Sequence, residues 1–338
     1  MDKNPLLRKC LTVGISFLFV LTCLVPTTAQ NIQKSSLPAS SGLWLDVGGS
    51  GSNNYTTIQD AINNASNGDT VYVYNGVYND HVDYYGVYID KSINLVGENK
   101  HNTIIDATGN LIGINVFVGG VNVSGFTVKF ATGGTGRGIE VDNLGFPFKN
   151  VNIYNNIITQ NDNGFRNEVC ENCMLYNNII TDNNERGIWE YGDMSTTYIT
   201  NNEITNNPIG IEIGWNEKST TIENNHFESN DNGILISLDG SCKIINNSFI
   251  NNRVDSKIFY GPYYLGSFSL PLYKNKWDGN YWDNWEKTTP KPIISVFGLT
   301  LLIPFPGAHF IQIPLGVYPY FAFDWHPAQE PYDIPGMN

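Results

Sequence analysis

The chain has 338 residues, of which 32 are acidic and 19 are basic, so its formal net charge is −13. Proteins that bind a nucleic-acid backbone need a basic stripe, and this charge therefore argues against a nucleic-acid partner. Because 41% of the residues are hydrophobic and 13% are aromatic, the chain can bury a core and is not a disordered acidic tail.

The N-terminus has the pattern of an export signal. Lys3, Arg8 and Lys9 precede uncharged residues 11–25, and small residues up to Ala29 suit a signal peptidase. We predict a signal peptide over residues 1–29, then a linker over 30–43, and hence a secreted or cell-surface protein. An uncleaved anchor is the alternative, although this apolar stretch is short for a membrane span of about 20 residues.

One amphipathic helix is predicted near residues 57–66. Thr57 and Asp60 are spaced as a capping box, and Asn67-Gly68 is a stop signal. The apolar residues on one helical face are Ile58, Ala61, Ile62 and Ala65. We expect this helix to cap the repeated region that follows it.

The middle of the chain repeats with a period of about 23 residues. An Asn-Asn pair recurs five times at intervals of 22, 24, 23 and 22 residues. The second members of these pairs are Asn156, Asn178, Asn202, Asn225 and Asn247. A second column follows five residues later: Asn161, Asn183, Asn207, Asn230 and Asn252. A glycine column, spaced by 23 residues, contains Gly164, Gly187, Gly210 and Gly233.

This period is too short for helix-pair repeats, and the leucine signature of a leucine-rich horseshoe is absent. Each unit instead has short β-branched runs in alternation, separated by turns rich in Asn and Gly. We predict an all-β parallel β-helix over residues 44–256, with three short strands per coil. Stacked coils bring like residues together, so we interpret the first Asn column as a structural ladder of mutually hydrogen-bonded amides.

The segment 257–338 differs in composition. Residues 259–325 contain 18 aromatic residues, residues 290–338 contain nine prolines, and residues 292–323 carry no formal charge. Prolines would interrupt a membrane-spanning helix, so we favour an aromatic C-terminal cap on the solenoid. A hairpin that contacts a membrane or a partner is the alternative.

Several motifs resemble known β-helix proteins. Residues 58–73, the run Gly76-Val-Tyr and the run Ile93-Asn-Leu-Val-Gly-Glu resemble the opening of right-handed parallel β-helices of the pectin-lyase-like superfamily. The Asn-Asn and Gly-Ile coils resemble NosD-type repeats, and residues 275–285 and 323–334 resemble closing motifs of exported archaeal members. This resemblance implies a right-handed β-helix, whereas the superfamily includes both enzymes and non-catalytic surface proteins.

No cofactor is expected. The resemblance to NosD raises the question of copper, but Met174, Met194 and Met337 and the five histidines are scattered, so we do not expect copper. The three cysteines outside the signal, Cys170, Cys173 and Cys242, are interpreted as buried thiols, with a metal site or small loop at the CxxC as the alternative. Asp278, Asn280 and Asp283 are a calcium candidate, for which turn capping is the favoured alternative.

A candidate binding face follows from the glycine column. Residues two and four positions after each glycine should point out of one sheet, because side chains alternate along a strand. Gly138 heads a similar coil upstream of this column, and with it included these positions contain Glu140, Asp142, Arg166, Glu168, Trp189, Tyr191 and Glu212. Aromatic rings and carboxylates suit a glycan, and the resemblance places the sugar-binding sheet of related enzymes here. A simply solvated face is the plainest alternative.

We therefore expect an exported, non-catalytic surface or envelope module that binds a polysaccharide or a surface protein. No residue is assigned a catalytic role. The alternative is a polysaccharide lyase or glycoside hydrolase acting on the same face, for which two carboxyl groups about 5 to 9 Å apart would be needed.

Overall fold

The computed structural model describes residues 42–192, 196–214, 220–237, 242–265, 275–305 and 309–334, all within one compact unit, Ser40–Asn338. The predicted signal peptide and residues 30–41 of the predicted linker lie outside these described residues.

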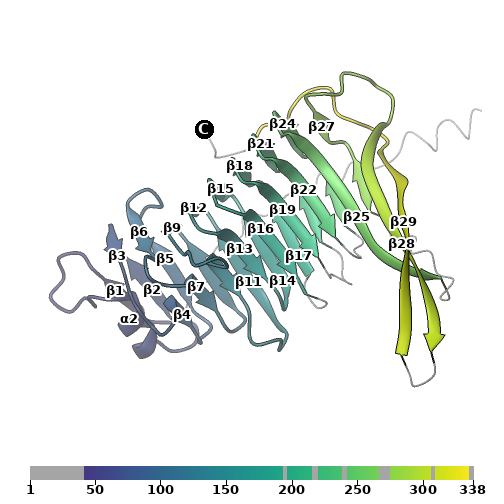
Figure 1. Cartoon of the computed structure of the whole chain (residues 1–338). Helices are drawn as coiled ribbons and strands as arrows, with labels where there is room; N and C mark the ends of the chain where they lie inside the picture. Colours follow the sequence, from purple (N-terminus) through teal and green to yellow (C-terminus); the bar gives the residue numbers. More distant parts are fainter. Residues whose placement is uncertain are drawn as a thin grey trace, which may run out of the picture. The chain divides into compact units, whose positions relative to one another are not determined.

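The described chain forms a right-handed parallel β-helix, as predicted (Figure 1). Each full coil contributes one strand to each of three rows, and successive coils pair in parallel along every row. The first row comprises β4 (Tyr85–Ile89), β7 (Ile112–Val116), β10 (Arg137–Val141), β13 (Asn163–Asn167), β16 (Arg186–Tyr191), β19 (Ile209–Gly214), β22 (Asn232–Ser237) and β25 (Val254–Leu265). The second row comprises β1 (Trp44–Val47), β2 (Thr70–Val73), β5 (Asn94–Gly97), β8 (Val121–Ser124), β11 (Phe148–Tyr154), β14 (Cys170–Tyr176), β17 (Thr196–Thr200), β20 (Thr221–Glu223), β23 (Lys243–Ile245) and β26 (Lys276–Asp278). The third row comprises β3 (Gly76–Tyr78), β6 (Thr103–Asp106), β9 (Thr127–Lys129), β12 (Ile157–Thr159), β15 (Ile179–Thr181), β18 (Glu203–Thr205), β21 (His226–Glu228), β24 (Ser248–Ile250) and β27 (Tyr281–Trp282).

Helix α2 (Ile58–Asn64) lies at the start of this stack, next to β1 and β2. The hydroxyl of its N-cap residue, Thr57, accepts the backbone N–H of Asp60 at 3.1 Å, which satisfies one of the free donors of the first turn. Ile58, Ala61 and Ile62 are buried against the first coils. The helix therefore covers apolar side chains that the first coils would otherwise expose.

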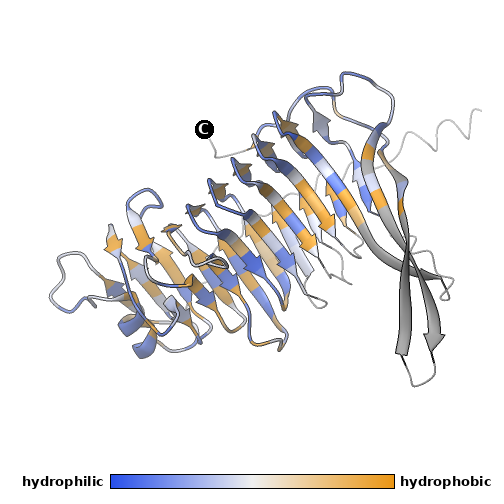
Figure 2. Ribbon diagram, viewed as in Figure 1, coloured by the Kyte–Doolittle hydropathy of each residue, from blue (hydrophilic) through white to orange (hydrophobic). Residues whose placement is uncertain are grey.

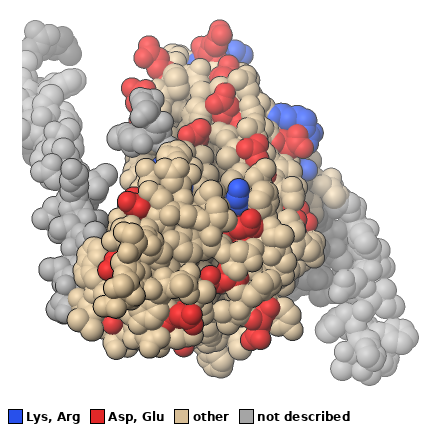
Figure 3. Space-filling view, turned by 90° about the vertical axis from the view of Figure 1, so that its left-hand side faces the viewer, with Lys and Arg blue, Asp and Glu red and all other residues tan. Residues whose placement is uncertain are grey.

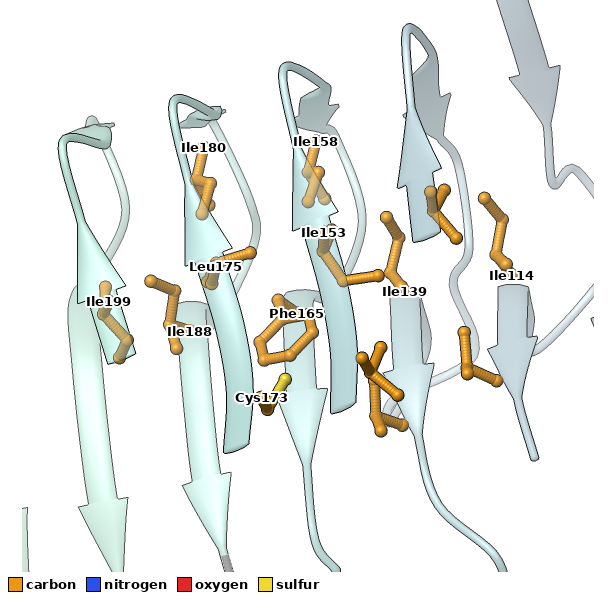
Figure 4. Close-up of a cluster of buried hydrophobic side chains, with 14 of the residues drawn as sticks. Ile114, Ile139, Ile153, Ile158, Phe165, Cys173, Leu175, Ile180, Ile188 and Ile199 are labelled. Atoms are coloured by element: carbon orange, nitrogen blue, oxygen red, sulfur yellow. The ribbon is translucent and has the colours of Figure 1, made fainter. Parts of the chain in front are cut away.

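The interior consists of aliphatic columns. Ile139 pairs with Phe165, and Phe165 pairs with Ile188 in the next coil; all three are fully buried (Figure 4). Apolar positions recur at the same place on neighbouring strands, as Figure 2 shows. Contact between like side chains, one coil above another, is what holds the stack together.

The two residues of each Asn-Asn pair have different tasks. The first residue adopts a left-handed backbone conformation, with φ between 53° and 56° at Asn155, Asn177, Asn201, Asn224 and Asn246. Asn tolerates this region better than most residues, so it suits the turn between the second and third rows. The second residue points inward and forms the ladder.

The ladder is directional. In each coil the backbone N–H and the Nδ2 of the second Asn both donate to Oδ1 of the Asn in the next coil; for Asn202 and Asn225 these distances are 2.9 and 3.0 Å. Nδ2 of Asn202 also donates to the carbonyl of Leu175 at 2.8 Å. The five predicted ladder residues, Asn156, Asn178, Asn202, Asn225 and Asn247, all lie in this buried chain of hydrogen bonds.

The ladder extends further than the repeat in the sequence. Asn247 donates to Asn280, and Asn280 donates to Oδ2 of Asp324 at 3.0 Å from its backbone N–H and 2.9 Å from Nδ2. The indole N–H of Trp282 donates to the same oxygen at 3.1 Å. A carboxylate accepts without needing to donate, so Asp324 is suited to the last position.

The parallel stack continues past residue 256, where the sequence analysis placed the start of the cap. Strands β26 and β27 still pair with β23 and β24, and the Trp282 ring stacks on Phe249 with a centroid distance of 4.4 Å. The end of the chain is a long antiparallel hairpin of β28 (Lys291–Phe305) and β29 (His309–Asp324). Among the described residues, no helix has the length and apolar character needed to cross a membrane.

Candidate ligand-binding face

The residues predicted for the candidate face do lie together on the outer side of the first row. Register pairs Glu140 with Arg166, Arg166 with Trp189, and Trp189 with Glu212. Ile139 and Val141, on either side of Glu140, are fully buried in the interior, so Glu140 lies on the opposite side of the sheet. We call the outer residues Glu140, Asp142, Arg166, Glu168, Arg186, Trp189, Tyr191 and Glu212 the charged face.

Arg166 is the centre of this face. Its Nη1 donates to Oε1 of Glu140 at 2.6 Å, and its Nη2 donates to Oε2 of Glu168. Glu140 is only 3% exposed, although it belongs to the outer side of the sheet. One guanidinium therefore bridges two carboxylates from neighbouring coils, a charge-assisted arrangement that fixes all three side chains.

Arg186 forms a second centre that the sequence analysis did not assign. Its Nε donates to Oε2 of Glu212 in the next coil, and its Nη1 donates to Oδ1 of Asn163 at 3.2 Å. The prediction considered only the positions two and four residues after each glycine, whereas Arg186 directly precedes Gly187.

Both guanidinium groups also lie over the ring of Trp189. The distances from the guanidinium carbon to the ring centroid are 4.9 Å for Arg166 and 4.6 Å for Arg186. Tyr191 packs beside Trp189, with ring centroids 5.4 Å apart and planes tilted by 50°. Cation–π contacts thus hold the tryptophan in place, and Tyr191, half-buried, is the aromatic residue next to it.

The remaining carboxylates modify the electrostatics of the face. Burial raises the pKa of Glu168; Arg166 opposes this shift, whereas Asp142 and Glu140 add to it. Asp142 is half-buried, and its Oδ1 accepts the backbone N–H of Gly145 at 3.4 Å. Glu168 is thus the carboxyl of this face whose proton is held more tightly than usual.

The calcium candidates do not converge. Asp278 accepts a contact from His326 at 2.7 Å and one from Lys276 at 3.1 Å. Asn280 is buried in the ladder, and Asp283 accepts the backbone N–H of Asn251 at 2.5 Å. Within the part of the chain that the structure describes, no group of three His, Cys, Asp or Glu side chains could hold a metal ion.

The three cysteines are free and buried. A hydrogen bond that the Cys173 thiol donates to Cys170, together with burial, raises the pKa of Cys173, and burial raises the pKa of Cys242 to about 12. The thiols of Cys173 and Cys242 are therefore protonated at neutral pH, which makes them poor metal ligands and poor nucleophiles.

Comparison with known proteins gives one family. A family model described as periplasmic copper-binding protein (NosD) matches residues 62–287. No curated protein sequence matches. This agrees with the NosD-type resemblance of the Asn-Asn coils.

Solved structures of pectin methylesterases have a similar fold. One in complex with a hexasaccharide has 12% sequence identity and a TM-score of 0.45 over 63% of this chain and 80% of its own. The carrot enzyme has 12% identity and a TM-score of 0.36 over 74% of this chain and 84% of its own. The enzyme PemA from Erwinia chrysanthemi has 11% identity and a TM-score of 0.39 over 69% of this chain and 92% of its own.

Proposed function

This chain belongs to the NosD family, and from that premise we propose that it is an exported envelope protein that binds a glycan on the charged face without cleaving it. The family description names a periplasmic protein, which supports export. The N-terminal sequence supports the same location, because it has the charge and hydropathy pattern of a signal peptide.

The observation that carries the non-catalytic proposal is the bridging position of Arg166. Its guanidinium contacts both Glu140 and Glu168, and Arg186 contacts Glu212. A glycosidase needs one carboxyl to give a proton and another to act as base or nucleophile across the scissile bond. Here an arginine stands between the two carboxylates, which favours holding a ligand over cleaving it.

Among the described residues we find no set of side chains that fits copper, although the family description names this metal. The thiols of Cys173 and Cys242 are protonated, Met174 is exposed on the second row, and no group of three His, Cys, Asp or Glu side chains converges among the described residues. We derive no role for copper in the described part of this chain.

Calorimetric titration with a panel of neutral and acidic oligosaccharides tests the proposal. We expect binding without new reducing ends or unsaturated products. Trp189→Ala should weaken binding about tenfold, because the rings of this face supply much of its contact area. Trp44→Ala is the matched control, since Trp44 is 62% exposed and lies on β1 in the second row. Equal effects of the two variants, or no binding at all, would contradict the proposal.

A polysaccharide lyase or hydrolase is the second candidate, and the raised pKa of Glu168 is the observation that favours it. A carboxyl that holds its proton more tightly than usual is better suited to act as a general acid. Product formation that disappears in Glu168→Gln, while binding persists, would establish the enzyme and exclude the non-catalytic role.

A further inference from the structure

A second aromatic cluster lies upstream of the charged face, on the same side of the same row. Tyr85 and Tyr88 are on β4, and Phe117 follows β7. The ring centroids of Tyr85 and Tyr88 are 5.2 Å apart, and those of Tyr88 and Phe117 are 5.4 Å apart. We call these three half-buried residues the tyrosine cluster.

Register connects this cluster to the charged face. Tyr88 pairs with Asn115, and Asn115 pairs with Glu140. Burial raises the pKa of Tyr85, and the negative charges of Glu140 and Asp142 raise it further, which agrees with their closeness. The tyrosine cluster and the Trp189–Tyr191 pair therefore flank the Arg166 centre along one continuous surface.

Unsatisfied polar atoms lie between the two aromatic groups. Asn115 is 3% exposed, and its Oδ1 makes no hydrogen bond within the described residues. The Nε atom of Arg166 is also buried without a hydrogen bond in the described chain. Buried polar groups normally have partners, and an orphaned one costs about 1–3 kcal/mol, so two on one surface indicate a missing partner. An acceptor and a donor on one surface match hydroxyl groups, which both donate and accept.

The charge of this surface argues against an acidic ligand. Three arginines, Arg137, Arg166 and Arg186, face five carboxylates, Glu140, Asp142, Glu168, Glu185 and Glu212, which gives a formal charge of −2. Each arginine already has a carboxylate partner, so no guanidinium is left for a uronate. On the side of the molecule that lies at the left in Figure 1, which is a different view from that of this surface, acidic side chains are likewise more prominent than basic ones (Figure 3).

We propose that this surface binds a neutral, hydroxyl-rich oligosaccharide that runs along the solenoid axis from the tyrosine cluster to Trp189 and Tyr191. The ligand then crosses β4, β7, β10, β13 and β16, a distance of about 19 Å at about 4.8 Å per coil. Its hydroxyl groups supply the missing partners of Asn115 and Arg166. This inference rests on the proposed function and specifies its ligand.

Titration with neutral oligosaccharides of increasing length, and with uronate oligosaccharides of matched length, tests this inference. We expect affinity to rise with length until the span is filled, and neutral chains to bind at least about tenfold more tightly than uronates at low salt. Tyr88→Ala should weaken the longest chain about tenfold and leave the disaccharide unchanged. Tyr84→Ala is the matched control, because Tyr84 is 69% exposed and its ring is not part of the cluster.

Asn115→Leu separates a binding role from a structural one. Removing an orphaned buried amide should leave thermal stability unchanged or increase it, yet weaken binding of the longest chain about tenfold. Lower stability with unchanged affinity would overturn the inference.

The outcomes also separate this inference from the proposed function. Binding that depends on Trp189 but not on ligand length or Tyr88 would overturn the axial span and leave the proposed function standing. Tighter binding of uronates would overturn the neutral ligand class. If no oligosaccharide binds, both proposals fail.

Discussion

The interior ladder and the charged face occupy the same coils, yet they are built on opposite rules. The ladder has Asn in coil after coil, because the Asn of each coil donates hydrogen bonds to the side-chain oxygen of the equivalent Asn in the next coil. The charged face changes at every coil, from Glu140 to Arg166 to Trp189 to Glu212. Repetition therefore marks the positions that build the stack, and variation marks the positions that are free to recognise a ligand.

The strongest test of this contrast is to remove one rung. Asn202→Ala takes away the acceptor of two donors on Asn178 and the donor to Asn225 and Leu175. Since these groups are buried, we expect a loss of about 4 kcal/mol in the free energy of unfolding, measured by urea denaturation. Asn64→Ala, an exposed amide on α2, should change it by less than about 0.5 kcal/mol. Equal effects would show that the ladder adds no measurable stability to that of the apolar columns.

A substitution on the charged face should reduce the free energy of unfolding by a smaller amount. Arg166→Met leaves Glu140, which is almost fully buried, with Arg137 as its remaining ion-pair partner among the described residues. We expect a loss of about 2 kcal/mol, between the values for exposed and fully buried pairs. The control is Arg253→Met, whose partner Asp231 is exposed like Arg253 itself; it should cost less than about 0.5 kcal/mol. A loss as large as that of Asn202→Ala would place the face among the structural elements.

The smallest effect on stability is expected at Asp162, whose carboxylate accepts backbone N–H groups of loop 132–136. Burial alone would raise the pKa of Asp162, but the backbone N–H groups of Gly136, Gly134 and Gly133 and the amide of Asn184 lower it. A lowered pKa stabilises the fold above the ordinary Asp value of about 3.9, and this contribution is lost as the pH falls through the lower folded value.

We therefore expect loop 132–136 to lose amide-exchange protection when the pH falls from about 5 to about 3, with a cost of about 1 kcal/mol. Asp162→Asn should remove this pH dependence. An unchanged acid response in the variant would assign the effect to other carboxyl groups.

The regular part of the molecule could be predicted because its interactions repeat in the sequence. The period of about 23 residues predicted the coils, the three rows and the inward Asn column, and the prediction of a right-handed parallel β-helix is confirmed. The ladder positions of Asn280 and Asp324 could not be found in this way, because they follow at intervals of 33 and 44 residues. The first interval contains the long strand β25, and the second contains the hairpin of β28 and β29, so neither has the length of the repeat.

The charged face was harder to predict for a different reason. Strand alternation correctly placed Glu140 and Arg166 on the outer side of the sheet. It does not predict the direction in which a long side chain bends over its neighbours. Arg166 and Arg186 turn along the sheet to reach carboxylates one coil away, and so Glu140 is buried rather than solvated. Asn163, one position before the glycine column, was missed because only residues after each glycine were read.

The carboxylate of Asp324 gives the solenoid a polarity and a fixed terminus. Every earlier rung both receives and passes on hydrogen bonds toward the C-terminus, whereas Asp324 only receives them. A carboxylate has no proton to pass to a further rung, so the chain of hydrogen bonds ends at Asp324. We therefore expect that whole coils can be gained or lost between Phe126, whose backbone N–H donates to the first Asn of the ladder, and Asn280, with both ends left intact. The solenoid would then become longer or shorter by whole coils, while Asp324 would still end the ladder.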